Sequence, residues 1–435
     1  MANYAGTDFS TPKLDGEALR RYTSKNIKEN IFQNILALPE KGVTEKFSED
    51  TDASEIRIIR QVAPKIDARR MGAPVNGGYF NQNNPLLPQS VEYGLKILYM
   101  IDDQVDFPTV MDEMVELPVA EATTKAVGGI VSRNINASTL AHQIAAVINQ
   151  EVAESGSANY VALASAGAYK DGLLDANGKL DDGDVENGID IFPIDGRQIF
   201  VKAATRTGLF KQGNIIVGGS NYAQEMLARG TISPNTYKQD KLEYVGEIDS
   251  VPVCVAGKPI WDLAEDYLGL DRGTLGIVDA VAVAGIATGR ALAFNNSVKI
   301  IDCPRGQGRT AQYKYRWGVE VFNFKGIVPV LAYNKTLADI SATALTIEAP
   351  ASVTTSKLTA PSLTDDSGNK KFTWSAITHA ASYDVYNGTT KVATVAAGST
   401  LAYTYGDTTG SFTVVAVSGN VRYTNSDAST ALVIS

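Results

Sequence analysis

The sequence predicts an α+β protein that carries a small all-β domain at its C-terminal end. Apolar residues recur at helical spacing within residues 109–157. They alternate as in strands near residues 90–100 and 312–324, and after residue 357 the pattern consists only of short strands. Helix and strand patterns that occupy separate stretches of one chain are typical of α+β folds.

The composition is that of an ordinary globular protein. The chain has 435 residues, of which 44% are hydrophobic and 20% charged, and its formal net charge is -9. This length predicts two to four domains at roughly 100–200 residues each. The negative charge disfavours non-specific nucleic-acid binding by the whole chain. Residues 357–435 carry five Asp against five Lys or Arg and no Glu, which marks them as a different module.

The first hundred residues predict parts that need a partner surface. Residues 1–54 form a polar arm in which residues 26–38 have the spacing of a short amphipathic helix. Residues 55–100 predict an extended hairpin, with strands at 55–65 and 90–100 and a tip rich in Gly, Asn and Pro. A two-stranded ribbon is marginal alone in water, and so polar an arm cannot fold alone. Both should therefore lie against another domain or a neighbouring subunit.

Residues 109–157 predict a helix. Its clearest part begins near Asn136 and Ser138, which are good N-cap residues, and an apolar stripe follows. Upstream, Pro118 and the pair Gly128-Gly129 are expected to kink or break the helix.

The middle of the chain predicts a loop-rich stretch and then a compact α/β unit. Residues 157–195 are expected to be mostly loop, with a solvated acidic hairpin at 175–190. Within residues 196–290 we expect the following elements: strands at 215–217 and 251–255, and helices at 222–228, 260–268 and 279–289.

The last part of the chain returns to strands. Strands are expected at 312–324 and 326–331. Residues 335–356, rich in Ala, Thr and Ser, predict a flexible linker. Residues 357–435 predict a small sandwich, because short Thr-, Val- and Tyr-rich runs are separated by regularly spaced turns.

The sequence contains no readable catalytic or metal-binding constellation, so we predict no enzyme, no cofactor and no metal site. The two histidines, His142 and His379, lie in different predicted elements, and each is expected to be structural or solvated. Ser220 lacks the second flanking Gly of a nucleophile elbow and is expected to be an N-cap. Residues 172–179 lack the spacing and the Ser or Thr of a phosphate loop.

The acidic run and the cysteines also favour structural roles. No register of residues 175–186 matches a calcium-binding EF-hand loop, so a solvated hairpin is favoured over a calcium site. Cys254 is expected to be a small core residue, and no base stands near Cys303 in the sequence. The absence of a CxxC motif indicates no disulfide framework or zinc site, and a reducing compartment is the default. Neither a signal peptide nor a membrane span is readable.

Arg305, Arg309, Lys314 and Arg316 form a basic cluster beside aromatic residues. Alternation puts Lys314 and Arg316 on one face of a strand, which favours intersubunit salt bridges over contact with nucleic acid.

The order and lengths of these elements resemble those of the major capsid proteins of tailed bacteriophages, the Hong-Kong-97-type fold that encapsulins share. The resemblance covers roughly residues 20–334 and includes the strand–turn–helix pattern of residues 214–230. It implies the following parts: an N-terminal arm (1–54), an extended hairpin loop (55–100), a peripheral domain with a spine helix (101–195), an axial domain (196–290) and closing strands of the peripheral domain (291–334).

Residues 357–435, after the linker at 335–356, resemble a fibronectin-type-III or immunoglobulin-like (Ig-like) domain. Trp374 fits the core Trp of the second strand, residues 381–386 fit the next strand and residues 412–417 the sixth. Phe412 stands at the usual tyrosine-corner position, so the hydrogen bond of that corner is not expected. Several tailed phages append domains of this kind to their capsid proteins.

The resemblance implies a function and a set of partners. The chain would self-assemble through pentamers and hexamers into the icosahedral head shell of a virion around double-stranded DNA, with the Ig-like domain on the outer surface. It would be synthesised in the host bacterial cytoplasm. Implied partners are other copies of the chain, a scaffolding protein, portal and decoration proteins, the packaged DNA and a host-surface or glycan ligand, with no membrane. In some relatives a Lys of the extended loop bonds covalently to an Asn of a neighbour; Lys65 and Asn334 do not align with that pair, so no crosslink is expected.

Three other functions are weighed against this one. A surface adhesin or phage fibre protein would predict a β-rich or repetitive N-terminal part, whereas residues 109–290 are substantially helical in pattern. An enzyme with a carbohydrate-binding-like appendage would need a catalytic constellation. An encapsulin-like shell protein has the same fold, and the appended domain argues against it.

Overall fold

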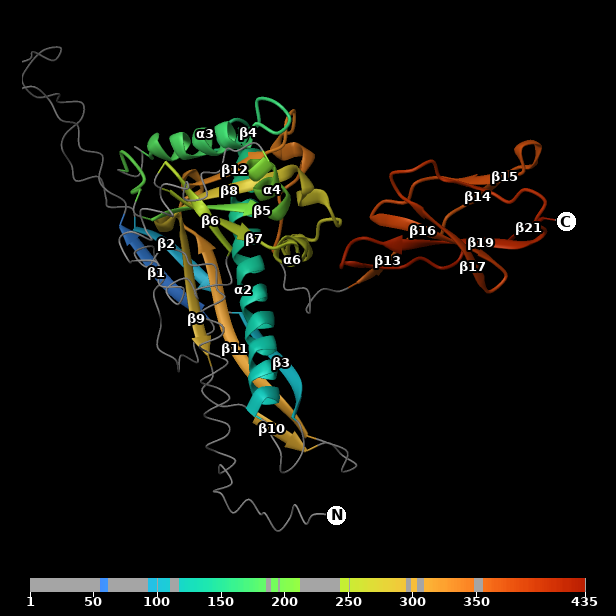
Figure 1. The fold of residues 1–435 in the computed structure, drawn as a ribbon, viewed down its shortest axis with the longest axis horizontal. Helices are drawn as coiled ribbons and strands as arrows, with labels where there is room; N and C mark the ends of the chain where they lie inside the picture. The colour runs from blue at the N-terminus through green and yellow to red at the C-terminus, as the bar shows by residue number, and fades with distance from the viewer. Residues whose placement is uncertain are drawn as a thin grey trace, which may run out of the picture. The chain divides into compact units, whose positions relative to one another are not determined.

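The structure is a computed structural model that divides into two units. It describes residues 55–61, 93–99, 101–109, 117–184, 189–194, 196–211, 243–249, 251–294, 299–302, 309–347 and 355–434. One unit comprises Met1–Gly257 with Val278–Thr336, and the other Lys258–Ile277 with Leu337–Ser435 (Figure 1). The second unit thus joins part of the range predicted as an axial domain to the C-terminal domain.

The predicted hairpin strands are confirmed. Strands β1 (Glu55–Gln61) and β2 (Tyr93–Tyr99) form an antiparallel sheet of their own, in which Glu55 lies opposite Tyr99 and Gln61 opposite Tyr93. No third strand joins this sheet among the residues that the structure describes. The predicted tip and the arm at 1–54 lie outside those residues.

A second sheet is built around one long strand, β11 (Arg309–Val321). On one side β11 pairs with β3 (Ile101–Thr109), and on the other with β10 (Lys299–Asp302) and then β9 (Thr288–Phe294), always antiparallel. As the alternation predicts, Tyr313, Tyr315 and Trp317 face one way and are buried. Their rings stack in sequence, with centroids 6.4 and 5.3 Å apart. We call these three residues the aromatic stripe.

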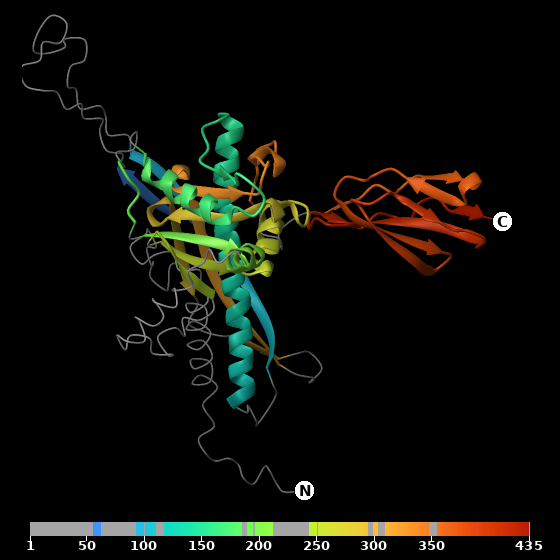
Figure 2. The same ribbon diagram turned by 45° about the horizontal axis from the view of Figure 1, so that its top comes forward.

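Helix α2 (Leu117–Ala153) runs along β3 and β11 as a single element of 37 residues (Figures 1 and 2). The amide of Asn134 donates to the hydroxyl of Tyr315 at 3.0 Å, which ties the helix to the aromatic stripe.

The predicted break in this helix is wrong. Pro118 is the second helical residue, where a missing N–H costs nothing, and Gly128-Gly129 lie inside the helix. Asn136 and Ser138, predicted to cap a helix, are instead buried residues of its interior. Packing against the sheet compensates the propensity cost of each glycine, which is about 1 kcal/mol.

A six-stranded mixed sheet forms the core of the first unit. In spatial order its strands are β4 (Val161–Ala162), β12 (Ile327–Leu331), β8 (Val278–Ala284), β5 (Arg197–Lys202), β7 (Val251–Ala256) and β6 (Glu243–Ile248). Helices α3 (Tyr169–Asp181) and α4 (Ala203–Lys211) contact each other and β8. The sheet therefore joins strands from three of the predicted ranges, 101–195, 196–290 and 291–334.

Several predicted elements of this region can be compared with the structure. The predicted strands at 251–255 and 326–331 and the predicted helix at 260–268 are confirmed as β7, β12 and α6 (Lys258–Leu268). The predicted helix at 279–289 is wrong, because these residues form β8, a 3-10 turn and the start of β9. The run Asp279 to Ala284 alternates small and β-branched residues, and its place between β12 and β5 buries both of its faces. The predicted elements at 215–217 and 222–228 lie outside the described residues.

The loop-rich stretch predicted at 157–195 contains helix α3, and its acidic run is not a solvated hairpin. Asn177 and Asp184 are buried. Arg197, whose side chain is 0% exposed, donates to Asp181 Oδ1 at 2.7 Å, to Asn177 Oδ1 at 2.6 Å and to the carbonyl of Phe192 at 2.6 Å. The guanidinium thereby links α3 to the start of β5.

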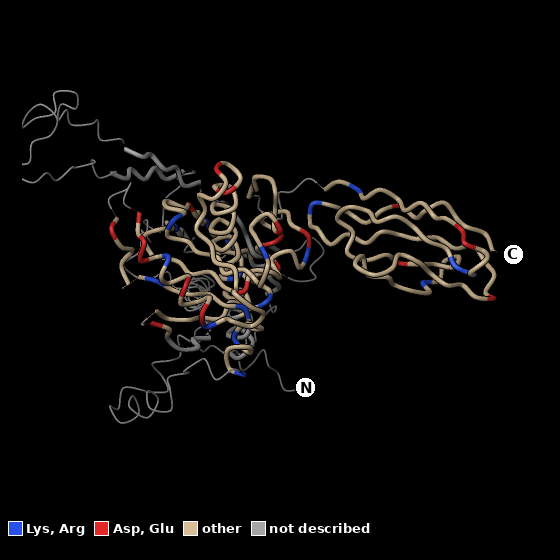
Figure 3. The backbone as a smooth tube through the Cα atoms, turned by 90° about the horizontal axis from the view of Figure 1, so that it is seen from above, with Lys and Arg blue, Asp and Glu red and all other residues tan. Residues whose placement is uncertain are grey.

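The C-terminal β domain, residues 355–434, contains two main sheets. One has the order β14 (Leu363–Asp366), β15 (Lys371–Trp374), β18 (Ala402–Thr404); the other has the order β17 (Thr390–Ala396), β16 (Ala380–Asn387), β19 (Gly410–Ser418), β21 (Leu432–Ile434). A short pair, β13 (Ser356–Lys357) with β20 (Tyr423–Thr424), completes the domain. The predicted core residues are all buried: Trp374, Tyr383, Val385, Phe412, Val414 and Ala416. Basic and acidic residues are interspersed along this domain (Figure 3).

We predict that Arg197→Ala lowers the free energy of unfolding by about 3–5 kcal/mol, because it removes the buried cation of a hydrogen-bonded cluster. The matched control is Lys258→Ala, which breaks the exposed pair with Asp262 at 2.6 Å and should cost about 0.5 kcal/mol or less. Urea titration followed by circular dichroism compares the two variants. Equal stabilities would contradict the role given to Arg197.

Candidate functional site

The described residues among those singled out in the sequence lie on separate elements. His142 lies on α2, where Nδ1 is 2.7 Å from the carbonyl oxygen of Ser138, and burial lowers the pKa of its imidazole. Cys254 is buried in β7, and burial raises the pKa of its thiol to about 11. Residues 172–179 lie on helix α3 rather than on a loop. Within the described parts of the chain, no group of three or more His, Cys, Asp or Glu residues could hold a metal ion. Ser220 and Cys303 are outside the described residues.

Other charged residues of the predicted clusters have partners within the chain. Asp184 accepts hydrogen bonds from Asn323 at 2.8 Å and from Lys325 at 3.1 Å. In the β11 sheet, the register aligns Arg316 with Asp102 of β3. Of the predicted basic cluster, Lys314 is exposed on the face of β11 opposite the aromatic stripe.

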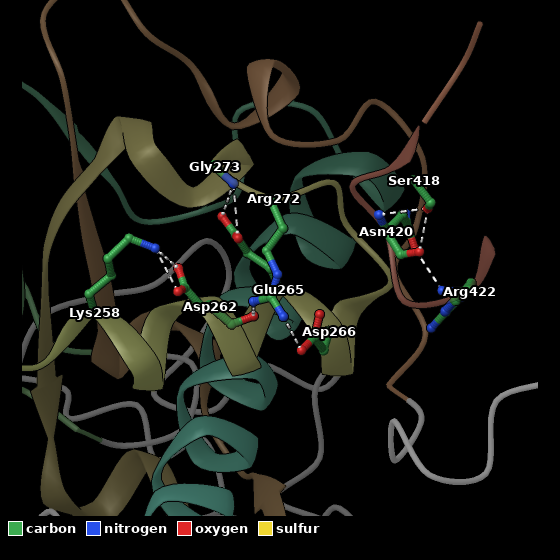
Figure 4. Close-up of polar contacts among 9 residues, drawn as sticks. All are labelled: Lys258, Asp262, Glu265, Asp266, Arg272, Gly273, Ser418, Asn420 and Arg422. Atoms are coloured by element: carbon green, nitrogen blue, oxygen red, sulfur yellow. Dashed lines mark hydrogen bonds and ion pairs between the residues drawn. The ribbon is translucent and has the colours of Figure 1, made fainter. Parts of the chain in front are cut away.

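The site that the structure does assemble lies in the second unit, after helix α6. The carboxylate of Glu265 accepts from the backbone N–H of Gly273, at 3.0 Å to each oxygen (Figure 4). It also accepts from the backbone N–H of Leu275, at 2.8 Å. Burial raises the pKa of this carboxyl group, and these hydrogen bonds oppose the increase. The guanidinium of Arg272 donates to Asp266 and to the carbonyl of Asp262. Residues 269–272, which we call the docking loop, are therefore held on α6.

Asn420 of the C-terminal β domain uses both ends of its side-chain amide. Its oxygen accepts the N–H of Arg422 at 3.0 Å, within its own loop (Figure 4). Its nitrogen donates to the carbonyl of Gly269 at 2.8 Å and to Asp271 Oδ1 at 3.0 Å, both in the docking loop. The side chain of Asn420 is buried, so each of these polar atoms needs its partner.

His379 reaches the same carboxylate oxygen. Its Nδ1 lies 2.8 Å from Asp271 Oδ1, and because an ionised carboxylate only accepts, Nδ1 carries the hydrogen. The imidazole stacks on the ring of Tyr423 with centroids 4.3 Å apart. The backbone of His379 has a φ of 66°, and its carbonyl accepts the N–H of Gly419 at 3.0 Å, which fixes the residue in this turn.

Backbone contacts complete the arrangement. The N–H of Arg272 donates to the carbonyl of Gly419 at 2.9 Å. Gly269 has a φ of 64°, and a Cβ placed there would lie 2.2 Å from Nε of Arg422. One end of the C-terminal β domain and the docking loop thus meet through complementary donors and acceptors. The sequence does not indicate a role for Asp271, because the run Leu-Asp-Arg-Gly is typical of a turn.

Comparisons with known proteins find solved structures alone. No family model and no curated protein matches the chain. It is similar to a structure from Mycobacterium phage Che8, with 16% identity and a TM-score of 0.35 over 64% of this chain and 85% of that one. It is also similar to the capsid of the cyanophage P-SCSP1u, with 10% identity and a TM-score of 0.39 over 69% of this chain and 89% of that one. A virus-like particle from Pyrococcus furiosus has 9% identity and a TM-score of 0.37, over 72% of this chain and 99% of that one. At these levels the function has to be argued from the chain's own residues.

One further finding concerns membranes: among the described residues, no helix is both long and apolar enough to span a bilayer.

We predict that Glu265→Ala loosens the docking loop. The N–H groups of Gly273 and Leu275 lose their acceptor, and an unsatisfied buried donor costs about 1–3 kcal/mol. Amide hydrogen exchange of the peptide that covers residues 270–276, measured by mass spectrometry, should become faster. Asp262→Ala, which removes a half-buried carboxylate of the same helix, is the control and should leave that exchange unchanged.

Proposed function

We propose that this chain is the major capsid protein of a tailed bacteriophage, which assembles with copies of itself into the icosahedral shell of a virion. One observation carries the proposal: among the residues that the structure describes, no third strand joins the β1–β2 hairpin, and β2 contacts β11 of the same chain. A ribbon of two strands is marginal in water unless one of its faces packs on another surface. A shell supplies such surfaces, because each subunit repeats the same heterologous contacts until they close.

The order of the elements supports the same proposal. A hairpin, a long helix packed on a long strand, a mixed α/β sheet and a returning buried strand follow one another, as in the capsid family that the sequence resembles. The net charge of -9 suits a wall that encloses a genome without gripping it along its whole surface.

The finer parts of the proposal concern the appended domain and the partners. We propose that the C-terminal β domain is Ig-like and stands on the outer face of the shell, where it takes up no genome space and can meet a host surface or a glycan. The proposed partners also include a scaffolding protein, the portal, decoration proteins and the packaged DNA, and synthesis would take place in the cytoplasm of a bacterial host.

We predict that the purified chain, alone or with a scaffolding partner, forms capsomers of five and six copies or closed shells. Sedimentation velocity and electron microscopy measure this directly. A stable monomer under all conditions, with or without phage partners, would show that the proposal is wrong.

Deletion of residues 70–89, the polar tip of the hairpin, should impair shell formation and leave the circular dichroism of the subunit unchanged, because the tip adds little to an intramolecular core.

We also predict that a chain that ends after Ala349 still forms shells. The truncation keeps every residue of the first unit. Electron microscopy of these shells beside full-length shells should show density lost from the outer face. Loss of assembly, or density missing from the inner wall, would contradict the proposed display of the domain.

A further inference from the structure

We propose that Asp271 locks the C-terminal β domain onto the docking loop, so that residues 258–277 and the domain form one structural unit. This inference concerns the second unit alone and does not depend on the proposed capsid function. It differs from the expectation drawn from the sequence, in which a flexible linker at 335–356 is the only connection.

The first argument is the convergence of donors on one carboxylate oxygen. Asp271 Oδ1 accepts from Asn420 at 3.0 Å and lies 2.8 Å from Nδ1 of His379. The two donors come from different turns of the β domain, one before β16 and the other after β19. Hydrogen bonds to a charged group are roughly twice as strong as those between neutral groups. A single side chain of the docking loop therefore holds two separate turns of the domain.

The second argument is that each side of the contact is held in position by hydrogen bonds within that side. On the domain side, the hydroxyl of Ser418 donates to the carbonyl of Asn420 and accepts the N–H of Asn420, and the side-chain oxygen of Asn420 accepts the N–H of Arg422. On the loop side, Glu265 holds the backbone at Gly273 and Leu275. Preorganised donors and acceptors lose little freedom on docking, so more of the interaction energy is retained.

The third argument is the way in which the linker begins. Leu337 and Ile340 are buried, with exposed fractions of 1% and 6%, and Leu337–Asp339 forms a 3-10 turn. Farther on, the guanidinium of Arg422 donates to the carbonyl of Thr346 at 3.2 Å. Residues 337–346 of the stretch predicted as a flexible linker thus include buried and hydrogen-bonded residues of the second unit.

The test uses two variants of the full-length chain and hydrogen exchange read by mass spectrometry. Asp271→Ala removes the shared acceptor. Asn420→Asp keeps an oxygen for the N–H of Arg422 but turns a carboxylate toward Asp271 and the carbonyl of Gly269, so like charges oppose docking. In both variants, exchange of the peptide that contains the Arg272 amide should accelerate by about tenfold or more. Amides of the domain core, at Val414 and Ala416, should stay protected.

Matched controls remove the same groups elsewhere in the domain. Asp407→Ala takes away an exposed carboxylate that pairs with Lys370, and Asn387→Ala takes away an amide that donates to the carbonyl of Thr409. Neither should change exchange in the docking loop. The proposal is overturned if the Arg272 peptide exchanges in the unaltered chain as fast as an unprotected peptide, or if both variants leave its exchange unchanged. Should Asp271→Ala also unfold the core, Asn420→Asp alone decides the question.

Discussion

The aromatic stripe of β11 has to be covered, and helix α2 is the element that covers it. Three large rings that point the same way would expose on the order of 150–250 Å² each if left in water. A strand of 13 residues spans roughly 44 Å, and only a helix of comparable length can follow it. A helix of 37 residues reaches roughly 55 Å. Helix α2 is thus long enough to follow the whole strand, and the hydrogen bond from Asn134 to Tyr315 joins the two.

The same dependence explains where sequence reasoning succeeded and where it did not. Alternation found the second strand of the hairpin, the buried face of β11 and the inward residues of the C-terminal β domain. It failed for β8, which is buried on both faces and so shows no alternation of apolar with polar residues to distinguish it from a helix. The expected break at Gly128-Gly129 failed for the opposite reason, since local propensity was weighed without the sheet that supports the helix.

The candidate site was beyond the reach of the sequence for a different reason. Asp271, His379 and Asn420 are common turn residues, and none stands in a motif. Asp271 lies 108 positions before His379 and 149 before Asn420. What makes them a site is that two loops of the β domain and one loop after α6 arrive at the same oxygen atom. The three loops come together only in the tertiary structure. Sequence reasoning did find the module boundary, through the missing Glu and the balanced charge of residues 357–435.

Gly269 shows how such a contact would constrain the evolution of the chain. Its positive φ disfavours any side chain, and a Cβ would also meet Arg422. The contact of a Cβ with Arg422 can be relieved when the long arginine side chain moves, but the strain of the positive φ cannot. In related chains that keep the domain docked, substitutions at these two positions should therefore be unequal: Arg422 can exchange for smaller residues, whereas Gly269 tolerates at most Asn. A chain that lost the domain would lose Arg422 with it, whereas the positive φ would still disfavour a side chain at Gly269.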